Sequence, residues 1–397
     1  MTSINLPDLL LLSRDTPIAK ITGGEVFPML PERLPIFLKR RGDARAWLES
    51  RAIDSHRTNS RLLKKALRIE RKDDLTTVLT VNAATITDNY WVKPIGDEAT
   101  RYGDVRFKMN SFAELALTGD VNSFDQPPGR TPELTNTGSF EKCWRLEDGV
   151  WWMYKAGSAN ELFSELLAFR LGRYLGLPIA EYAPAGAFIK SRDFTDSARV
   201  DFEPASGLIG DESDYVRIYQ ALAEMGGDIS EQYVLMCCFD GLIYNMDRHE
   251  NNFGFLRDSE TGKTLSLAPF FDHNISIIAR GYPRRAPDDL LISDFAALLR
   301  YTGKPLRMRG LSEEVLLREA REIPFEPATD AVAPDPWEFV ARYLSARQRA
   351  LEEQCRGLLV FEYDKPSVRA QIRGAKQEQT THRSAPKKEK HKNDPER

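Results

Sequence analysis

Apolar residues cluster into three runs in the middle of the chain. Residues 233–239 are apolar on every side, a pattern typical of a buried helix. Residues 252–256 and 264–271 are apolar and aromatic, and the polar segment 258–263 separates them. Two such runs around a short polar turn with a glycine predict a β-hairpin. The middle of the chain is therefore expected to run as helix, polar loop and hairpin.

The polar residues within this order indicate a chemistry. Asp247 and Asn252 lie five positions apart at the end of the loop, and Asp272 follows the hairpin. A kinase catalytic loop needs this arrangement: the first acid accepts or orients the proton of the attacking hydroxyl, the Asn binds one magnesium ion, and the second acid binds another. Alone, D-x-x-x-x-N is more often a polar surface loop. The hairpin and the second acid favour the catalytic interpretation.

A strand with a lysine and a helix with acids precede this centre. Residues 150–155 form an apolar and aromatic run that ends in Lys155, and apolar residues between 163 and 175 repeat at helical spacing. A strand lysine that pairs with a glutamate on the next helix positions phosphates in kinases. Glu165 shares a helix face with small residues, and Glu161, one turn earlier, is the alternative partner. The competing interpretation of Lys155 is an edge residue that reaches solvent.

A small, hydroxyl-rich loop at residues 133–140 lies before the strands. The backbone N–H groups of Thr137, Gly138 and Ser139 are candidates for phosphate binding, because small residues let a phosphate approach the backbone. The loop has a single glycine and is not a G-x-G-x-x-G motif, so a plain hairpin loop is the competing interpretation. A further strand is predicted at residues 185–190.

The remaining pattern indicates a largely helical C-terminal half and a less regular N-terminal part. Residues 1–35 show no assignable periodicity, residues 126–130 are a predicted linker, and residues 194–210 are a predicted loop. The last predicted helix opens with Asp335 as N-cap and Pro336 at the first helical position. Predicted helices span residues 44–51, 57–69, 214–225, 288–300, 312–322 and 335–357.

Composition changes this picture little. The 397 residues suffice for two or three domains, and 42% hydrophobic with 29% charged residues is ordinary for a soluble globular protein. Four cysteines without paired spacing are typical of core thiols in a reducing compartment. No apolar run approaches the ~20 residues that span a bilayer, and the first residues lack the order of a signal peptide. We therefore expect a cytoplasmic protein without membrane contact.

Two segments have an unusual charge. Residues 364–397 are polar and lysine-rich with almost no aliphatic side chains, which predicts a disordered basic tail. Residues 40–72 carry many Arg and Lys side chains, most simply a solvated helical face. The alternative is a docking surface for nucleic acid or an acidic partner. The net charge of −4 supplies no global argument for nucleic acid or membrane.

The sequence D-R-H-x-x-N at 247–252, followed by a hairpin and an acid, resembles the HipA-like kinases of bacteria. It is also similar to the catalytic loop of phosphoinositide kinases. The order of loop, strand lysine, helix glutamate and then G-L-P at 176–178 matches the HipA-like pattern as well. The triplet at 272–274 is D-H-N and lacks the Phe and Gly of the common D-F-G signature. This departure argues against an ordinary eukaryotic-type protein kinase.

The resemblance implies an α+β, two-lobed kinase-like fold with a largely helical C-terminal lobe. It divides the chain into an N-terminal extension (1–125), a nucleotide lobe (131–190), a catalytic lobe (191–360) and the tail. It implies ATP and Mg²⁺ as cofactors, Asp247 and Lys155 as catalytic residues, and Asn252 and Asp272 as metal ligands. Residues implied to bind nucleotide are Thr137, Gly138, Ser139, Lys155, Glu165, Ile189 and Lys190, the last two at the adenine hinge.

The activity implied by the resemblance is phosphorylation of Ser or Thr in a protein. Some family members autophosphorylate in the phosphate loop, where Thr135, Thr137 and Ser139 are candidates here. The family includes toxin kinases, which makes an antitoxin or DNA-associated partner of the basic N-terminal region a further expectation. The pattern does not determine an oligomeric state. Two alternatives stay open: a lipid or small-molecule kinase, and a non-catalytic ATP-binding scaffold.

Overall fold

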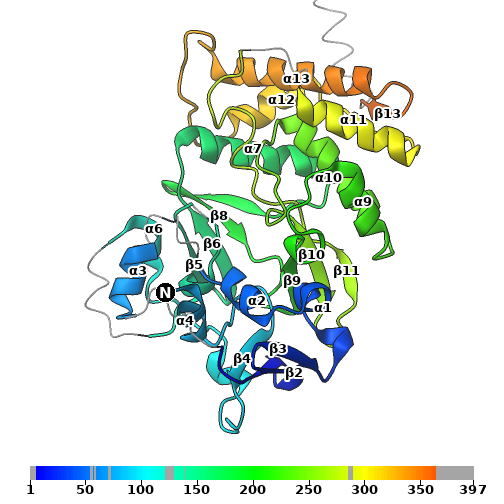
Figure 1. Ribbon diagram of the computed structural model, residues 1–397. Coiled ribbons are helices and arrows are strands. Elements are labelled where there is room, and N and C mark those ends of the chain that lie inside the picture. The colour runs from blue at the N-terminus through cyan, green and yellow to red at the C-terminus, as the bar shows by residue number, and fades with distance from the viewer. Residues whose placement is uncertain are drawn as a thin grey trace, which may run out of the picture.

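The computed structural model describes residues 6–53, 57, 60–69, 73–120, 129–138, 140–284 and 289–363. Within these residues the fold is mixed α/β, with several small sheets and many helices (Figure 1). Ser139, most of the predicted linker and the whole predicted basic tail lie outside the described residues. No helix in the described part of the chain has both the length and the apolar character needed to cross a membrane.

An antiparallel sheet with the strand order β3-β2-β1-β4 lies in the N-terminal region. Its strands are β1 (Leu9–Ser13), β2 (Thr16–Thr22), β3 (Glu25–Pro28) and β4 (Tyr90–Pro94). The sequence pattern missed β1 because four consecutive leucines hide the alternation of a half-buried strand. The helical elements of this region are η1 (Pro31–Arg33), α1 (Ile36–Arg41), α2 (Ala44–Ser50), α3 (Ser60–Ala66), α4 (Asp74–Leu79), α5 (Tyr102–Val105) and α6 (Ala113–Thr118).

A second antiparallel sheet, with the order β5-β6-β8-β7, carries Lys155. Its strands are β5 (Lys142–Glu147), β6 (Val150–Lys155), β7 (Tyr182–Ala185) and β8 (Phe188–Arg192), with η3 (Pro132–Thr135) before it and α7 (Ala159–Leu175) after β6. The single strand predicted at 185–190 is wrong. Gly186 adopts a positive φ of 66° between β7 and β8, so the chain turns there.

A third sheet, ordered β11-β10-β9, contains the predicted hairpin. Its strands are β9 (Val200–Pro204), β10 (Gly254–Asp258) and β11 (Thr264–Leu267), and α8 (Ser206–Ile209) follows β9. The hairpin prediction is confirmed, whereas the loop predicted at 194–210 is wrong. Asp201 and Glu203 interrupt the apolar pattern of β9, but both carboxylates are buried. A charged strand residue indicates solvent only where it lacks a buried partner.

The C-terminal half is helical, as predicted, and its helices gather in the upper part of Figure 1. They are α9 (Tyr215–Ala223), α10 (Ile229–Ile243), α11 (Leu290–Thr302), α12 (Glu313–Arg321) and α13 (Pro336–Gln354), with a parallel pair of strands, β12 (Leu306–Arg309) and β13 (Leu359–Glu362). Asp335 caps α13 through the N–H of Glu338. Helix α10 is buried on nearly every side, because it packs against α9, α11, α13 and β11.

Hydrophobic side chains from both sides of the predicted linker share one core. Trp91 and Phe112 from the N-terminal region pack in the same cluster as Trp144 and Trp151 from β5 and β6. A separate cluster lies between the first sheet and α1, α2 and α4. A third and larger cluster unites α7, the hairpin and the C-terminal helices. The division into domains at the linker stays a prediction. The hydrophobic core continues from the N-terminal region into β5 and β6.

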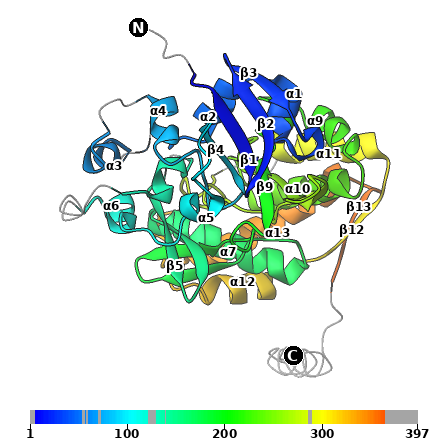
Figure 2. The same ribbon diagram turned by 90° about the horizontal axis from the view of Figure 1, so that it is seen from below.

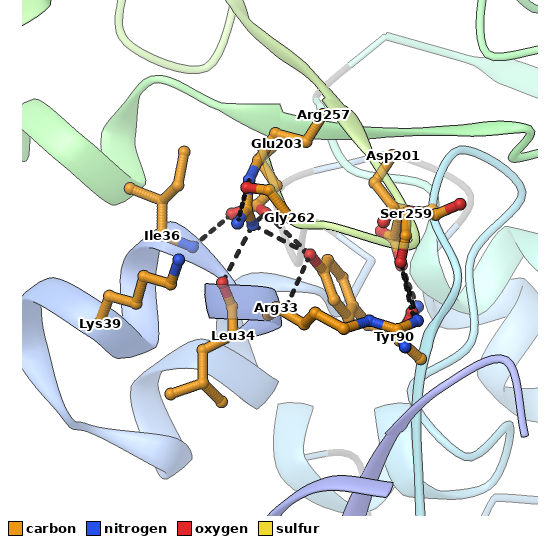
Figure 3. Close-up of polar contacts among 12 residues, drawn as sticks. Arg33, Leu34, Ile36, Lys39, Tyr90, Asp201, Glu203, Arg257, Ser259 and Gly262 are labelled. Atoms are coloured by element: carbon orange, nitrogen blue, oxygen red, sulfur yellow. Dashed lines mark hydrogen bonds and ion pairs between the residues drawn. The ribbon is translucent and has the colours of Figure 1, made fainter. Parts of the chain in front are cut away.

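A buried polar network joins the N-terminal region to the third sheet (Figure 3). Arg257 on β10 pairs with Glu203 on β9 and donates to the carbonyls of Leu34 at 3.0 Å and Glu32 at 3.1 Å. Glu203 also accepts the N–H of Ile36 at 2.6 Å and the hydroxyl of Tyr90 at 3.1 Å. Figures 1 and 2 both show the first sheet beside β9. The network holds the β10–β11 hairpin and β9 against the N-terminal region.

We expect Arg257→Met to destabilise the protein by about 3–5 kcal/mol, because it leaves the Glu203 carboxylate buried without its cation. Arg257 is 1% exposed. The urea midpoint of the transition that unfolds this region measures the loss. Arg307→Met is the control: Arg307 pairs with Glu362 on the surface, where an ion pair contributes about 0–1 kcal/mol. Equal effects of the two substitutions would contradict the structural role of the network.

Candidate active site

Lys155 lies at the end of β6 between two carboxylates. Its Nζ is 2.7 Å from Oδ1 of Asp272 and 3.5 Å from Oε2 of Glu165. Burial lowers the pKa of Lys155, but the carboxylates of Asp272 and Glu165 outweigh burial and hold the pKa well above its usual value. Lys155 is therefore a buried amine held in its protonated form, and not an edge residue that reaches solvent.

The structure distinguishes between the two predicted glutamate partners. Glu165 is fully buried on α7, and its Oε1 accepts the N–H of His273 at 2.8 Å while Oε2 faces Lys155. Burial raises the pKa of Glu165, but Lys155 and His273 outweigh it and keep the pKa below its usual value. Glu161 instead caps α7, where its Oε2 accepts the N–H of Ser158 at 2.8 Å. Glu165 is thus the residue that orients Lys155.

Asp272 stands where the chain leaves the hairpin. Its backbone is in the left-handed region, with φ 61°, and its N–H donates to the hydroxyl of Tyr182 at 3.1 Å. Burial raises the pKa of Asp272, but the ammonium groups of Lys155 and Lys142 outweigh it and hold the pKa far below its usual value. The carboxylate is therefore ionised, as a metal ligand must be.

The loop between α10 and β10 is closed by its own hydrogen bonds. Nδ2 of Asn252 donates to the carbonyl of Asp247 at 2.8 Å, and the N–H of Asn252 donates to the carbonyl of His249 at 2.9 Å. Because its amide nitrogen is engaged, Oδ1 of Asn252 is the atom left for a cation. Asp247 is half-buried, and burial raises its pKa above the usual value. A carboxylate of raised basicity suits a proton acceptor.

Arg248 ties the two candidate metal ligands together. Its Nη1 donates to the carbonyl of Asn252 and, at 2.7 Å, to the carbonyl of Phe271, the residue before Asp272. Its Nε and Nη2 bind the carboxylate of Asp240 at 2.8 and 3.0 Å. The sequence interpretation missed the pair of Asp240 and Arg248. A signal was available, because an acid inside the apolar helix α10 needs a buried cation.

Lys142 is a second cation that the sequence interpretation missed. It lies directly opposite Lys155 in the β5–β6 ladder, so both side chains leave the same face of the sheet. Its Nζ lies against Gly138, where a Cβ would collide with it. Burial lowers the pKa of Lys142 to about 8. Within the described part of the chain, Lys142 forms no ion pair, which leaves its charge for an anion at the site.

The predicted phosphate loop is only partly described. Thr137 is exposed, and Gly138 has a φ of 97°, a conformation that favours glycine. The hydroxyl of Thr135 donates to the carbonyl of Ala84 at 2.8 Å and is buried, so Thr135 serves the structure of the loop. Ser139 lies outside the described residues. The loop adjoins Lys142, which places Gly138 at the site.

The two predicted hinge residues point to opposite faces of their strand. Ile189 lies opposite Lys155 in the β6–β8 ladder and is buried. Lys190 lies opposite Tyr154, on the other face of the sheet. Its Nζ is 2.5 Å from Oε2 of Glu147 and stacks on the ring of Trp152. The structure therefore does not bring the side chain of Lys190 to Lys155, and adenine contact by this strand stays a prediction.

The donor set fits a magnesium ion bound together with a nucleotide. Among the described residues no group of three or more His, Cys, Asp or Glu side chains is placed to hold a metal. Magnesium is commonly bound by one or two protein oxygens together with substrate phosphates. Oδ1 of Asn252 and the carboxylate of Asp272 are two such oxygens, and Arg248 holds their backbones together.

ATP affinity is expected to fall as the pH rises from about 7 to 9, because Lys142, with its pKa of about 8, loses the charge that attracts phosphate. One charged hydrogen bond corresponds to about 1.5–3 kcal/mol, or roughly 10–100-fold in the Kd. Isothermal titration across this pH range measures it. Lys142→Met should weaken binding at pH 7 and flatten the pH dependence, whereas Lys20→Met, at an exposed position on β2, should change neither. A wild-type pH slope that persists in Lys142→Met would exclude Lys142 as its source.

Comparisons with known proteins give distant structural likenesses. No family model matches the sequence, and no curated protein matches it. The chain is similar to the proinflammatory kinase CtkA of Helicobacter pylori, with 19% identity, a TM-score of 0.37, and coverage of 53% of this chain and 94% of CtkA. It is also similar to HipA of Shewanella oneidensis, solved with HipB and operator DNA, with 13% identity, a TM-score of 0.49, and coverage of 87% of this chain and 97% of HipA. Likenesses of this size carry no functional argument, so function has to be argued from the site.

Proposed function

We propose that this chain is an ATP- and magnesium-dependent protein serine/threonine kinase of the HipA-like type, with two lobes that meet at Lys155 and Asp272. One observation carries the proposal: Lys155, held by the buried Glu165, lies 2.7 Å from Asp272. A strand lysine, a helix glutamate and an acid after a hairpin are the parts that phosphoryl transfer requires at one place. Lys155 and Asp272 are 117 positions apart in the sequence, so local structure does not explain their contact.

Each residue of the site has a role in the proposed reaction. Lys155 and Lys142 attract the phosphates of ATP, and Glu165 holds Lys155 in place. The hydroxyl oxygen of the acceptor attacks the γ-phosphorus, the bond from that phosphorus to the β–γ bridging oxygen breaks, and ADP leaves with the electron pair. Asp247 takes the hydroxyl proton. Asn252 and Asp272 would hold magnesium, which neutralises charge on the phosphates when bound.

The alternatives make different predictions. A lipid or small-molecule kinase would use the same loop but transfer phosphate to a different acceptor. A non-catalytic ATP-binding scaffold does not require a half-buried Asp247 with a raised pKa beside the metal ligands. In the phosphate loop, Thr137 is the exposed candidate for autophosphorylation among the described residues.

A DNA or antitoxin partner of residues 40–72 remains a prediction. Fewer of the cations in this segment are available to such a partner than the sequence alone indicates. Arg51 pairs with Asp88, and Arg57 and Lys64 are buried beside Glu133 and Asp74. These cations serve the fold, so the surface available to nucleic acid is smaller than the sequence suggests. Salt-sensitive binding to duplex DNA measures what remains.

Incubation of the purified protein with labelled ATP and magnesium tests the proposed function. We expect phosphate on the protein itself or on a general protein acceptor such as casein, and loss of the signal in the presence of a chelator. Intact mass and peptide mapping locate the modified residue. ATP binding without transfer to any acceptor would favour the scaffold, and transfer to inositol lipids alone would favour the lipid kinase.

A further inference from the structure

The segment that follows Asp272 is anchored to the catalytic loop. The N–H of Ile277 donates to the carbonyl of Ile243 at 2.8 Å, and the N–H of Met246 donates to the carbonyl of Ile275 at 3.3 Å. Met246 directly precedes Asp247. The backbone of residues 275–277 therefore runs alongside the residues that lead into the proposed proton acceptor.

A fixed turn follows this anchored backbone. The N–H of Ala279 donates to the carbonyl of Ser276, and the N–H of Gly281 donates to the carbonyl of Ile278, both at 2.9 Å. Asn160 at the start of α7 donates to the carbonyl of Ile278 at 3.3 Å. The turn between these contacts presents the residue at position 280 from a held backbone.

Arg280 is the residue that this turn presents. Its side chain is exposed, and it forms no ion pair with the described residues. Two other exposed arginines of this half of the protein do pair with a carboxylate: Arg307 with Glu362, and Arg342 with Glu338. Arg280 lies close enough to Asp247 to lower the pKa of that carboxyl, against the larger effect of burial. Arg284, four residues on, is exposed as well.

Two exposed neighbours of Asp247 in the sequence are suited to contact a peptide. Met246 is 45% exposed and His249 is exposed, so an apolar contact and a polar contact flank the proposed proton acceptor. The phosphate-binding lysines 142 and 155 lie instead beside Asp272. Arg280 is thus an exposed cation in the segment whose backbone is anchored to Ile243 and Met246, the residues that lead into Asp247, which makes the acceptor its expected partner.

We propose that Arg280 is a specificity-determining residue that binds an acidic side chain next to the phosphorylated Ser or Thr of a protein substrate. The inference rests on the proposed kinase function and adds the substrate class to it. A guanidinium on a fixed backbone binds a carboxylate with little loss of backbone entropy, and its planar fork matches the two oxygens. A substrate segment rich in Asp and Glu also complements Arg284.

Three synthetic peptides test the inference, each with one serine flanked by Glu, by Ala or by Lys. The wild-type protein should phosphorylate the Glu peptide with the lowest KM. Arg280→Ala should raise the KM for the Glu peptide about tenfold, the effect of one partly exposed charged contact. It should leave the KM for ATP and the rate with the Ala peptide unchanged. Arg280→Glu should reverse the preference toward the Lys peptide.

Arg106→Ala is the matched control, because Arg106 is exposed at the end of α5 and has no described ion pair. Circular dichroism verifies that each variant is folded. A kinase that shows no preference, or that keeps it in Arg280→Ala, overturns the inference and leaves the kinase function standing. A raised KM for ATP in Arg280→Ala would make Arg280 a nucleotide contact and also overturns the inference. Transfer only to phosphatidylinositol vesicles, or to no acceptor, overturns the proposed function with it.

Discussion

Asp247→Asn is expected to lower phosphoryl transfer by about 10²–10⁴-fold, the usual contribution of a positioned general base. ATP affinity should stay close to that of the wild-type protein, because the proposed role of Asp247 is toward the acceptor, whereas the two lysines proposed to attract phosphate, Lys155 and Lys142, adjoin Asp272. The backbone carbonyl of residue 247, which accepts a hydrogen bond from the side-chain amide of Asn252, is retained in the variant. Single-turnover assays with labelled ATP measure transfer, and calorimetry measures affinity.

Asp211→Asn controls for the loss of one negative charge, since Asp211 is exposed in the turn after α8. It should transfer phosphate at the wild-type rate. Full phosphate transfer by a folded Asp247→Asn protein would contradict a catalytic role for the loop at 247–252. A nucleotide-binding scaffold would then be the better description of the protein.

Asp272→Ala is expected to abolish the dependence of ATP binding on magnesium and to lower turnover on the order of 10²–10⁴-fold, corresponding to several kcal/mol of lost charge stabilisation. In the wild-type protein, ATP should bind weakly with chelator and tightly with magnesium. In the variant the two affinities should converge, because one of two protein oxygens is gone. Without metal, the variant should bind ATP no worse than the wild type, since Asp272 no longer competes with phosphate for Lys155.

Asp240→Asn provides a contrast to Asp272→Ala within the same network. Asp240 accepts hydrogen bonds from Arg248 through both carboxylate oxygens and is not one of the proposed metal ligands. This variant should lower turnover and stability but keep the difference in ATP affinity between magnesium and chelator. If the wild-type protein bound ATP equally well with and without a chelator, the assignment of Asn252 and Asp272 as metal ligands would be contradicted.

The local parts of the site were accessible from the sequence because they depend on short-range order. Asp247 and Asn252 lie in one loop, and the hairpin that leads to Asp272 is marked by its turn residues. The helix before the loop was predicted from its unbroken apolar run, which only burial explains. Asp335 and the proline after it likewise marked the start of α13.

The errors arose where distant residues change the meaning of a local pattern. The segment of β9 was predicted as a loop, whereas its two carboxylates are buried and bound by Arg257 and Asn89. The short β7 and the turn at Gly186 were merged into one strand, because two short strands and one long strand have similar composition. Lys190 stays a predicted hinge residue, although the register of β8 turns its side chain to the face away from Lys155.

The sequence by itself determined which chemical groups this protein carries and in what order: a strand lysine, a helix with two acids, an acid and an amide in one loop, and an acid after a hairpin. The tertiary structure alone decided that Glu165 and not Glu161 faces Lys155, and that Lys142 joins the site. It also decided that Arg248 binds the two candidate metal segments together. The physical reason is that local propensities act over a few residues, whereas burial and ion pairing depend on residues brought together from distant parts of the chain.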